Sequence, residues 1–261
     1  TIDSRLQKFA EEAVETHVSD LQKVFYNHWE GYTNAPFPED FELEQIDEII
    51  DMAMRRSVRY KRLKSQGKTI EQIRKVFDTK TEMKLFSWNG KKDTVLSPRD
   101  SLVYSKYFLH SGLMSMQPKT GHVKAYVGGI NYENFQYDHV TSGKRQVGST
   151  FKPFLYSLAI QEGYDPCFQV PNVPVVFDKY KWRLEKDWTP KNSGSEELEG
   201  LTLSLKYGLA NSINTVTAYI MKQFGPHAVV DLAKKIGVKS KILAVPSLCL
   251  GTFDLSVYEM V

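Results

Sequence analysis

Two short polar patterns in the second half of the chain have residue types and spacings suited to nucleophilic catalysis. The first is Ser149-Thr150-Phe151-Lys152, which is followed directly by Pro153. Because proline has no backbone N–H, it is tolerated only near the start of a helix, so Ser149 is expected at or just before the first turn. At about 100° per residue, Lys152 then lies about one turn further along the same face. A hydroxyl at a helix N-terminus, beside an amine that can accept its proton, is an activated nucleophile.

The second pattern is Ser212-Ile213-Asn214, which lies between two stretches of helical periodicity. In a short extended link, the first and third side chains would point to one side while Ile213 packs inward, which predicts a polar ledge. Both patterns also have a structural explanation, in which Ser149 and either Ser212 or Asn214 cap helices and Lys152 is solvated. The Ser-x-x-Lys pattern also occurs at 65–68, in a charged connection, and the Ser-x-Asn pattern at 87–89, in a hairpin.

Hydrophobic periodicity and turn residues predict the elements that position these patterns. Helices are expected at 3–30, 41–62, 69–77 and 98–109, and hairpins at 83–95 and 113–127. Helical periodicity returns at 150–162, 202–209, 215–224 and 227–236, with an irregular stretch from 165 to 194. The predicted fold class is α+β, with strands first and helices after.

Composition excludes several classes of protein. The 261 residues are 41% hydrophobic and 25% charged, enough for one large domain or a domain and a half with a buried core. The formal net charge is +3 and the charges are interleaved, so nucleic acid is not an expected partner. No apolar run approaches the roughly 18 residues of a membrane span. The 6 histidines show no metal-ligand spacing, and Cys167 and Cys249 are interpreted as packing residues, so no metal or other cofactor is expected.

The order of the two patterns, Ser-x-x-Lys and then Ser-x-Asn, is the order found in penicillin-interacting serine enzymes. Flanking sequence extends the match, in the runs Lys119 to Gly129, Lys144 to Phe154, Ser97 to Ser101 and Thr1 to Val14. Over 1–16 and 97–261, the chain resembles the transpeptidase module of class A, high-molecular-mass penicillin-binding proteins. The resemblance implies the penicillin-binding protein or serine β-lactamase-like transpeptidase fold, incomplete, with its first two sheet strands and its helical part. Residues 1–96 would form a mainly helical linker or pedestal with a β-hairpin, and residues 97–261 the N-terminal portion of the transpeptidase domain.

The resemblance also implies a reaction, the D,D-transpeptidation that cross-links peptidoglycan through a serine acyl-enzyme. Ser149 would attack the carbonyl between the two terminal D-alanines of a stem peptide, with Lys152 as general base. Ser212 would relay a proton toward the leaving amine, and Asn214 would bind the backbone amide of the donor peptide. The backbone N–H of Ser149 would supply half of an oxyanion hole. β-Lactam antibiotics would acylate Ser149 because their ring amide imitates the donor.

The third motif of this family, Lys-Thr/Ser-Gly on a later strand, does not follow Asn214. Lys119-Thr120-Gly121 has these letters but precedes the nucleophile and fits a hairpin turn. The motif is expected beyond Val261, and a glycosyltransferase module and membrane anchor are expected before Thr1, at the periplasmic face of a bacterial inner membrane. The isolated piece is expected to be nearly inert, because loss of one oxyanion donor alone costs about 10² to 10³ in rate. Exposed sheet edges are expected to favour self-association unless another chain covers them.

Three alternatives to a transpeptidase stay open. A D-alanine carboxypeptidase would use the same residues with water as the acceptor. A β-lactamase-like enzyme would need a further group to activate the deacylating water, and it seldom has such a long region before the nucleophile. A non-catalytic β-lactam-sensing or scaffold module would keep the fold without turnover.

Overall fold

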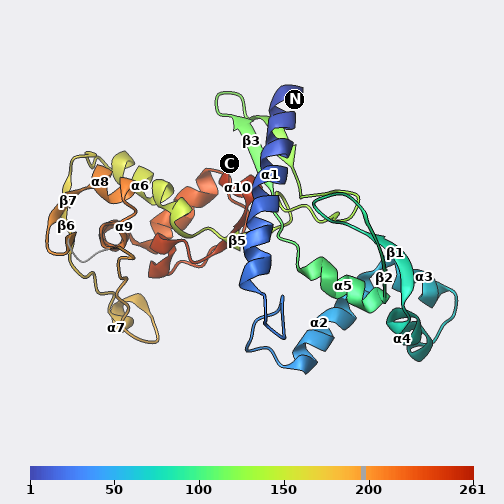
Figure 1. The fold of residues 1–261 in the computed structure, drawn as a ribbon. Helices are drawn as coiled ribbons and strands as arrows, with labels where there is room; N and C mark the ends of the chain where they lie inside the picture. Colours follow the sequence, from blue (N-terminus) through green and yellow to red (C-terminus); the bar gives the residue numbers. More distant parts are fainter. Residues whose placement is uncertain (195–197) are drawn as a thin grey trace. The chain divides into compact units, whose positions relative to one another are not determined.

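The computed structural model describes residues 1–194 and 198–261. They divide into two compact units, Thr1–Asp138 and His139–Val261, whose elements are drawn in Figure 1. Each unit has its own buried core. Each unit combines helices with two-stranded antiparallel sheets. The α+β class expected from the sequence is therefore confirmed.

The first unit contains one long helix that packs on a hairpin. In chain order the elements are α1 (Ser4–His28), α2 (Leu43–Arg56), α3 (Val58–Ser65), α4 (Ile70–Asp78), β1 (Thr81–Leu85), β2 (Lys92–Leu96), α5 (Pro98–Lys106), β3 (Leu113–Gln117) and β4 (His122–Val127). The Gln7 side chain of α1 hydrogen-bonds both backbone groups of Tyr126 in β4. Apolar side chains complete the contact between α1 and β4: Ala10, Val14, Val18, Ala125 and Val127. The helix therefore covers one face of the β3–β4 hairpin.

The helices of this unit depart from the prediction at one point. The periodicity of 41–62 predicts one helix, but the structure divides this stretch into α2 and α3 at Ser57. Ser57 has extended backbone angles (φ −68°, ψ 149°), and its hydroxyl caps α3 by accepting the N–H of Tyr60. A serine that hydrogen-bonds its own neighbouring backbone competes with helix formation, which explains the break. Both predicted hairpins are present, as β1–β2 and β3–β4.

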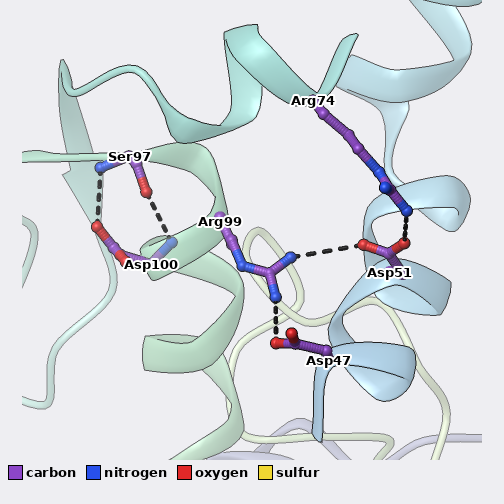
Figure 2. Close-up of polar contacts among 6 residues, drawn as sticks. All are labelled: Asp47, Asp51, Arg74, Ser97, Arg99 and Asp100. Carbon is purple, nitrogen blue, oxygen red and sulfur yellow. Dashed lines mark hydrogen bonds and ion pairs between the residues drawn. The ribbon is translucent and has the colours of Figure 1, made fainter. Parts of the chain in front are cut away.

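Charged side chains link α2, α4 and α5 on the surface of the first unit (Figure 2). Arg99 of α5 donates to Asp47 at 2.5 Å and to Asp51 at 3.5 Å. Arg74 of α4 donates to the other carboxylate oxygen of Asp51. Exposed ion pairs add little stability, so the apolar core of these helices holds them together. That core consists of Met54, Leu63, Ile73 and Phe77.

The second unit is mainly helical. In chain order the elements are β5 (Lys144–Gln146), the 3-10 helix η1 (Gly148–Phe151), α6 (Lys152–Gln161), β6 (Gln169–Pro171), α7 (Lys179–Trp182), β7 (Thr202–Ser204), α8 (Leu205–Ala210), α9 (Asn214–Lys235), the 3-10 helix η3 (Pro246–Leu250), β8 (Asp254–Ser256) and α10 (Val257–Met260). α6, α8 and η3 all contact α9 or one another around a single core. Its side chains include Phe151, Leu155, Val216, Met221 and Leu248. The core therefore joins α6, α8 and α9, and the two polar patterns lie at the ends of these helices.

Two expectations for the second unit are corrected by the structure and one is confirmed. Helix α8 starts only at Leu205, because Thr202–Ser204 is strand β7, which pairs with β6. The two helices expected at 215–224 and 227–236 are confirmed, because Gly225 (φ 78°, ψ 160°) interrupts the helical backbone inside α9. The strands β5 and β8 pair with each other, so strands do not all precede helices. Strands of 3 residues are too short for hydrophobic periodicity to reveal.

Candidate active site

Ser149 lies on the 3-10 turn that opens α6. η1 ends at Phe151 and α6 begins at Lys152, so Pro153 occupies an early helical position where no backbone donor is needed. This is the placement expected from the proline. Ser149 is exposed, whereas Lys152 is only 1% exposed. The pattern therefore presents a hydroxyl to solvent and buries the amine of the same turn.

The turn of Ser149 is fastened to the segment that follows η3. The N–H of Gly148 donates to the carbonyl oxygen of Gly251 at 3.0 Å, and the N–H of Val147 donates to that of Phe253 at 3.0 Å. The backbone N–H of Ser149 lies in the first turn, where a helix offers its donors no internal acceptor. The two residues that precede the nucleophile candidate are thus held in place by their backbone.

The Lys152 ammonium group directs all its hydrogen bonds to the second polar pattern. Nζ donates to the carbonyl oxygen of Ser212 at 2.7 Å, to Ser212 Oγ at 3.0 Å and to Asn214 Oδ1 at 2.6 Å. A lysine has three N–H donors, and all three are used. Burying an ammonium group is costly unless such acceptors surround it. Lys152 is therefore not the solvated residue of the structural alternative.

The structure thus joins three of the four predicted side chains by hydrogen bonds, and these bonds do not include Ser149. Lys152, Ser212 and Asn214 meet at one point. Within the part of the chain that the structure describes, no hydrogen bond links the hydroxyl of Ser149 to Lys152, although the two residues are one turn apart. Ser149 itself is exposed.

The Ser212-Ile213-Asn214 link is not extended at Ser212, so that part of the prediction is wrong. The side chains of Ser212 and Asn214 nevertheless point the same way, because both contact Lys152. Ser212 is left-handed (φ 54°), its N–H donates to Leu209 O at 3.0 Å, and the N–H of Ile213 donates to Gly208 O at 2.8 Å. These two bonds form a Schellman motif that closes α8, with Ser212 where glycine is usual. The left-handed region is unfavourable for serine, so the chain keeps strain at this residue. Ile213 is buried, as expected.

Burial lowers the pKa of Lys152 below its ordinary value of 10.5. A thiolate at Cys249 would act in the opposite direction, but burial raises the pKa of the Cys249 thiol to about 12. The thiol is therefore neutral near physiological pH, and burial decides the direction for Lys152. A lowered pKa increases the fraction of the amine that can accept a proton from a nucleophile.

Two residues that the sequence did not single out hold the site in place. Asn192 accepts the backbone N–H of Asn214 at 2.8 Å, and Gly251 accepts that of Gly148 at 3.0 Å. Asn192 lies in the irregular stretch 165–194, where periodicity carries no signal, and Gly251 was predictable only as part of a turn. Neither residue belongs to a sequence motif in which its distance along the chain from its partner is fixed.

The Lys119-Thr120-Gly121 sequence is a turn, as expected. It joins β3 to β4 in the first unit, and Gly121 has the left-handed backbone (φ 67°) that such a turn favours. These residues therefore do not form a strand.

Residues 1–194 and 198–261 contain neither a cluster of metal-ligating side chains nor a helix able to span a membrane. No group of three or more His, Cys, Asp or Glu side chains in these ranges is arranged to hold a metal ion. None of the helices described there combines the length and the apolar character needed to cross a membrane.

Comparison with known proteins assigns this arrangement to a family. Residues 112–244 match the penicillin binding protein transpeptidase domain, and residues 32–109 match the penicillin-binding protein middle domain. The chain therefore belongs to the penicillin-binding protein transpeptidase family, as its resemblance implied.

Individual relatives agree with this assignment. Penicillin-binding protein 1A of Aquifex aeolicus (strain VF5) is 27% identical over 273 residues, which cover 100% of this chain and 35% of the relative. Penicillin-binding protein 1A of Pseudomonas aeruginosa is 34% identical over 152 residues, 58% of this chain and 18% of the relative. The crystal structure of penicillin-binding protein 1A from Haemophilus influenzae shares the fold with a TM-score of 0.61 at 20% identity, over 99% of this chain and 40% of that one. The chain thus spans less than half the length of each of these proteins, and the expectation of a partial transpeptidase fold is confirmed.

Proposed function

We propose that the chain is part of a peptidoglycan D,D-transpeptidase that works through a serine acyl-enzyme. The observation that carries the proposal is the buried Lys152, whose pKa is lowered and whose amine is held between Ser212 and Asn214 one turn after an exposed serine. Membership of the transpeptidase family supports this class of reaction.

In the proposed acylation, Ser149 Oγ attacks the carbonyl carbon between the two terminal D-alanines of a stem peptide. Neutral Lys152 accepts the hydroxyl proton as the oxygen–carbon bond forms. The carbon–nitrogen bond to the last D-alanine then breaks, and its nitrogen leaves as an amine after taking a proton. Ser212 Oγ, 3.0 Å from Lys152 Nζ, is the relay for that proton. The backbone N–H of Ser149 supplies one of the donors that stabilise the oxyanion.

In the proposed second step, an amine of another stem peptide attacks the acyl-serine and restores the Ser149 hydroxyl. Asn214 orients the donor peptide, because one N–H of its amide donates to Lys191 O and the other is left for a substrate carbonyl. β-Lactams are expected to acylate Ser149 by the same route, with their ring amide in place of the donor bond.

The setting of the reaction is also part of the proposal. We infer a Lys-Thr/Ser-Gly strand, a peptidoglycan glycosyltransferase module and a membrane anchor in the protein at its natural length, which acts on the periplasmic side. The isolated chain is expected to have little transpeptidase activity without that strand, and to self-associate through uncovered sheet edges.

Labelling with a fluorescent penicillin tests the proposal. The protein at its natural length is expected to become labelled covalently, and Ser149→Ala to abolish the label. Ser65→Ala is the matched control, because Ser65 begins the other Ser-x-x-Lys sequence and only hydrogen-bonds Arg62 O. Failure of the wild-type protein to react would indicate a scaffold and refute the proposal.

The acceptor is tested separately by the release of D-alanine from a stem peptide. A transpeptidase is expected to release more D-alanine, and to form a cross-linked product, when an amine acceptor is added. Release that needs only water would indicate a carboxypeptidase, and rapid turnover of the penicillin label would indicate a β-lactamase-like enzyme.

A further inference from the structure

Lys191 and Asn192 hydrogen-bond both the side chain and the backbone of Asn214. The carbonyl oxygen of Lys191 accepts Asn214 Nδ2 at 2.7 Å. Asn192 Oδ1 accepts the backbone N–H of Asn214 at 2.8 Å and that of Thr215 at 3.1 Å. Two consecutive residues, more than twenty positions away in sequence, therefore fix both the rotamer and the main chain of the same residue.

The second of these contacts replaces a missing helix cap. α9 starts at Asn214, and its N-cap position is occupied by Ile213, which has no side-chain oxygen to offer. The first N–H groups of a helix have no internal acceptor, and a local Ser, Thr, Asp or Asn normally supplies one. Here the acceptor is Asn192. The helix that begins with the site residue is thus capped from a distant loop.

Asn192 is itself held by buried polar groups. Its Nδ2 donates to Asn172 Oδ1 at 3.1 Å and to Thr215 Oγ1 at 3.3 Å. Asn172 and Thr215 are 2% and 6% exposed, and their side chains hydrogen-bond each other. Asn172 Nδ2 donates in turn to Leu198 O at 2.6 Å. Because each member is paired, the network leaves Asn192 with one satisfied orientation, in which its oxygen faces α9.

The hydrogen bond from Asn214 to Lys191 also determines which amide atom of Asn214 faces Lys152. An amide that gives its NH₂ to Lys191 O must turn its oxygen the other way, and Asn214 Oδ1 lies 2.6 Å from Lys152 Nζ. With the amide reversed, its NH₂ would face the ammonium group and an acceptor for Lys152 would be lost. The loop therefore determines the surroundings of the amine.

We propose that Asn192 is a positioning residue for acylation: it holds the first turn of α9 so that Asn214 and Ser212 stay in register with Lys152. The inference rests on the proposed function, because it concerns the same amine and the same reaction. It predicts that removing this cap slows the chemistry by more than its effect on stability explains.

The test compares Asn192→Ala with Ser204→Ala in the protein at its natural length. Ser204 is a matched cap in the same unit: its hydroxyl accepts the N–H of Tyr207 at the start of α8, and the structure gives it no bond to the Lys152 cluster. The rate constant for acylation by a fluorescent penicillin and the melting temperature are measured for both variants. We expect Asn192→Ala to slow acylation about 10- to 100-fold, since small displacements of catalytic groups cost about this much, and Ser204→Ala to stay within about twofold of wild type.

A third variant, Asn192→Asp, keeps the acceptor for both N–H groups of α9 but loses the donor to Asn172 and Thr215. Its acylation rate is therefore expected to lie between that of Asn192→Ala and that of wild type. The rate is taken on the alkaline plateau of the pH profile, where an added charge no longer alters the protonation of Lys152.

The outcomes separate the inference from the proposed function. A wild-type protein that is not acylated refutes the function itself. If wild type is acylated but Asn192→Ala is acylated at the same rate, Asn192 does not position the site. The same conclusion follows if Asn192→Ala and Ser204→Ala have equal melting temperatures and equal acylation rates. Equal losses in Asn192→Asp and Asn192→Ala would also overturn the inference.

Discussion

The backbones of Gly148 and Gly251 approach so closely that a side chain at Gly251 has no room. A Cβ atom built on Gly251 would lie 2.0 Å from the carbonyl oxygen of Gly148 and 2.6 Å from its nitrogen. The same two residues are joined by the hydrogen bond from Gly148 N–H to Gly251 O, at 3.0 Å. Any side chain at Gly251 must therefore displace the backbone that directly precedes Ser149.

Gly251→Ala is accordingly expected to slow acylation of Ser149 by about 10²-fold, the cost of misplacing a reacting group by about 1 Å. Gly121→Ala is the matched control, because Gly121 has nearly the same backbone (φ 67° against 68°) but no atom within 4 Å of a built Cβ. Both variants bear the same left-handed penalty of about 1 to 2 kcal/mol. Acylation by a fluorescent penicillin distinguishes them, and equal rates would contradict the prediction.

The lowered pKa of Lys152 predicts a pH dependence for acylation. Only the neutral amine accepts the proton of Ser149, so the rate should rise with pH and level off at a pH below 10.5, the ordinary value. Lys152→Met, which keeps the length and loses the base, should slow acylation by about 10² to 10⁴. The measurement is the acylation rate from neutral pH to above pH 10.5. A profile that still rises above pH 10.5 would show that burial does not tune this amine.

Glu259 predicts sensitivity of the second unit to acid. Burial alone would raise its pKa, but hydrogen bonds from the Ser240 hydroxyl and from the backbone N–H groups of Ser256, Ser240 and Lys239 outweigh burial and lower the pKa to about 2. Because the folded value lies below the ordinary 4.5, the charged form favours folding. Its contribution is complete above pH 4.5 and is lost as the pH falls toward 2.

The Glu259→Gln variant tests this contribution. It should lower the free energy of unfolding near neutral pH by about 1.5 to 3 kcal/mol, because bonds to a charged acceptor are replaced by weaker ones. Glu162→Gln, at an exposed position of the same unit, is the control. Chemical denaturation at pH 7 and pH 3 should show the difference between Glu259→Gln and wild type shrinking in acid. A constant difference would mean that Glu259 acts by packing alone.

The sequence predicted the elements whose terminal backbone N–H groups are capped by residues next to them in the chain. α1 has Asp3 as its cap, and α5 has Ser97 before Pro98, so their starts follow from local residue types. Ser149 was placed before α6 for a similar reason, since Pro153 restricts where the helix begins. The buried Lys152 also agrees with a pattern in which the amine follows the hydroxyl by one turn.

The sequence could not predict what depends on distant partners. The conformation of Ser212 results from the end of α8, and α9 is capped by Asn192 from another segment. No local rule relates Asn192 to Asn214, because their contact exists only after the intervening chain has folded. The strand β8 is similar: it was missed because its pairing with β5 joins residues more than a hundred positions apart.

The first unit allows a comparison between a buried amide and the surface charges of Figure 2. Gln22 is 1% exposed; its Nε2 donates to Tyr107 O at 2.7 Å, and its Oε1 accepts the N–H of Leu109 at 2.8 Å. In Gln22→Leu both backbone groups lose their partner, and an unpaired buried group costs about 1 to 3 kcal/mol. The expected loss in the free energy of unfolding for the two groups together is therefore about 2 to 6 kcal/mol.

Arg74→Met removes one member of the surface ion network. In contrast to Gln22→Leu, it is expected to change the free energy of unfolding only slightly. The Arg74 side chain is 56% exposed, so its pair with Asp51 is screened by water and contributes less than about 1 kcal/mol. Asp51 also keeps its second partner, Arg99, in this variant. Urea denaturation of both variants should therefore place Gln22→Leu well below Arg74→Met in stability. The reverse order would mean that the charges between α2, α4 and α5, rather than the buried contact between α1 and the end of α5, hold this unit together.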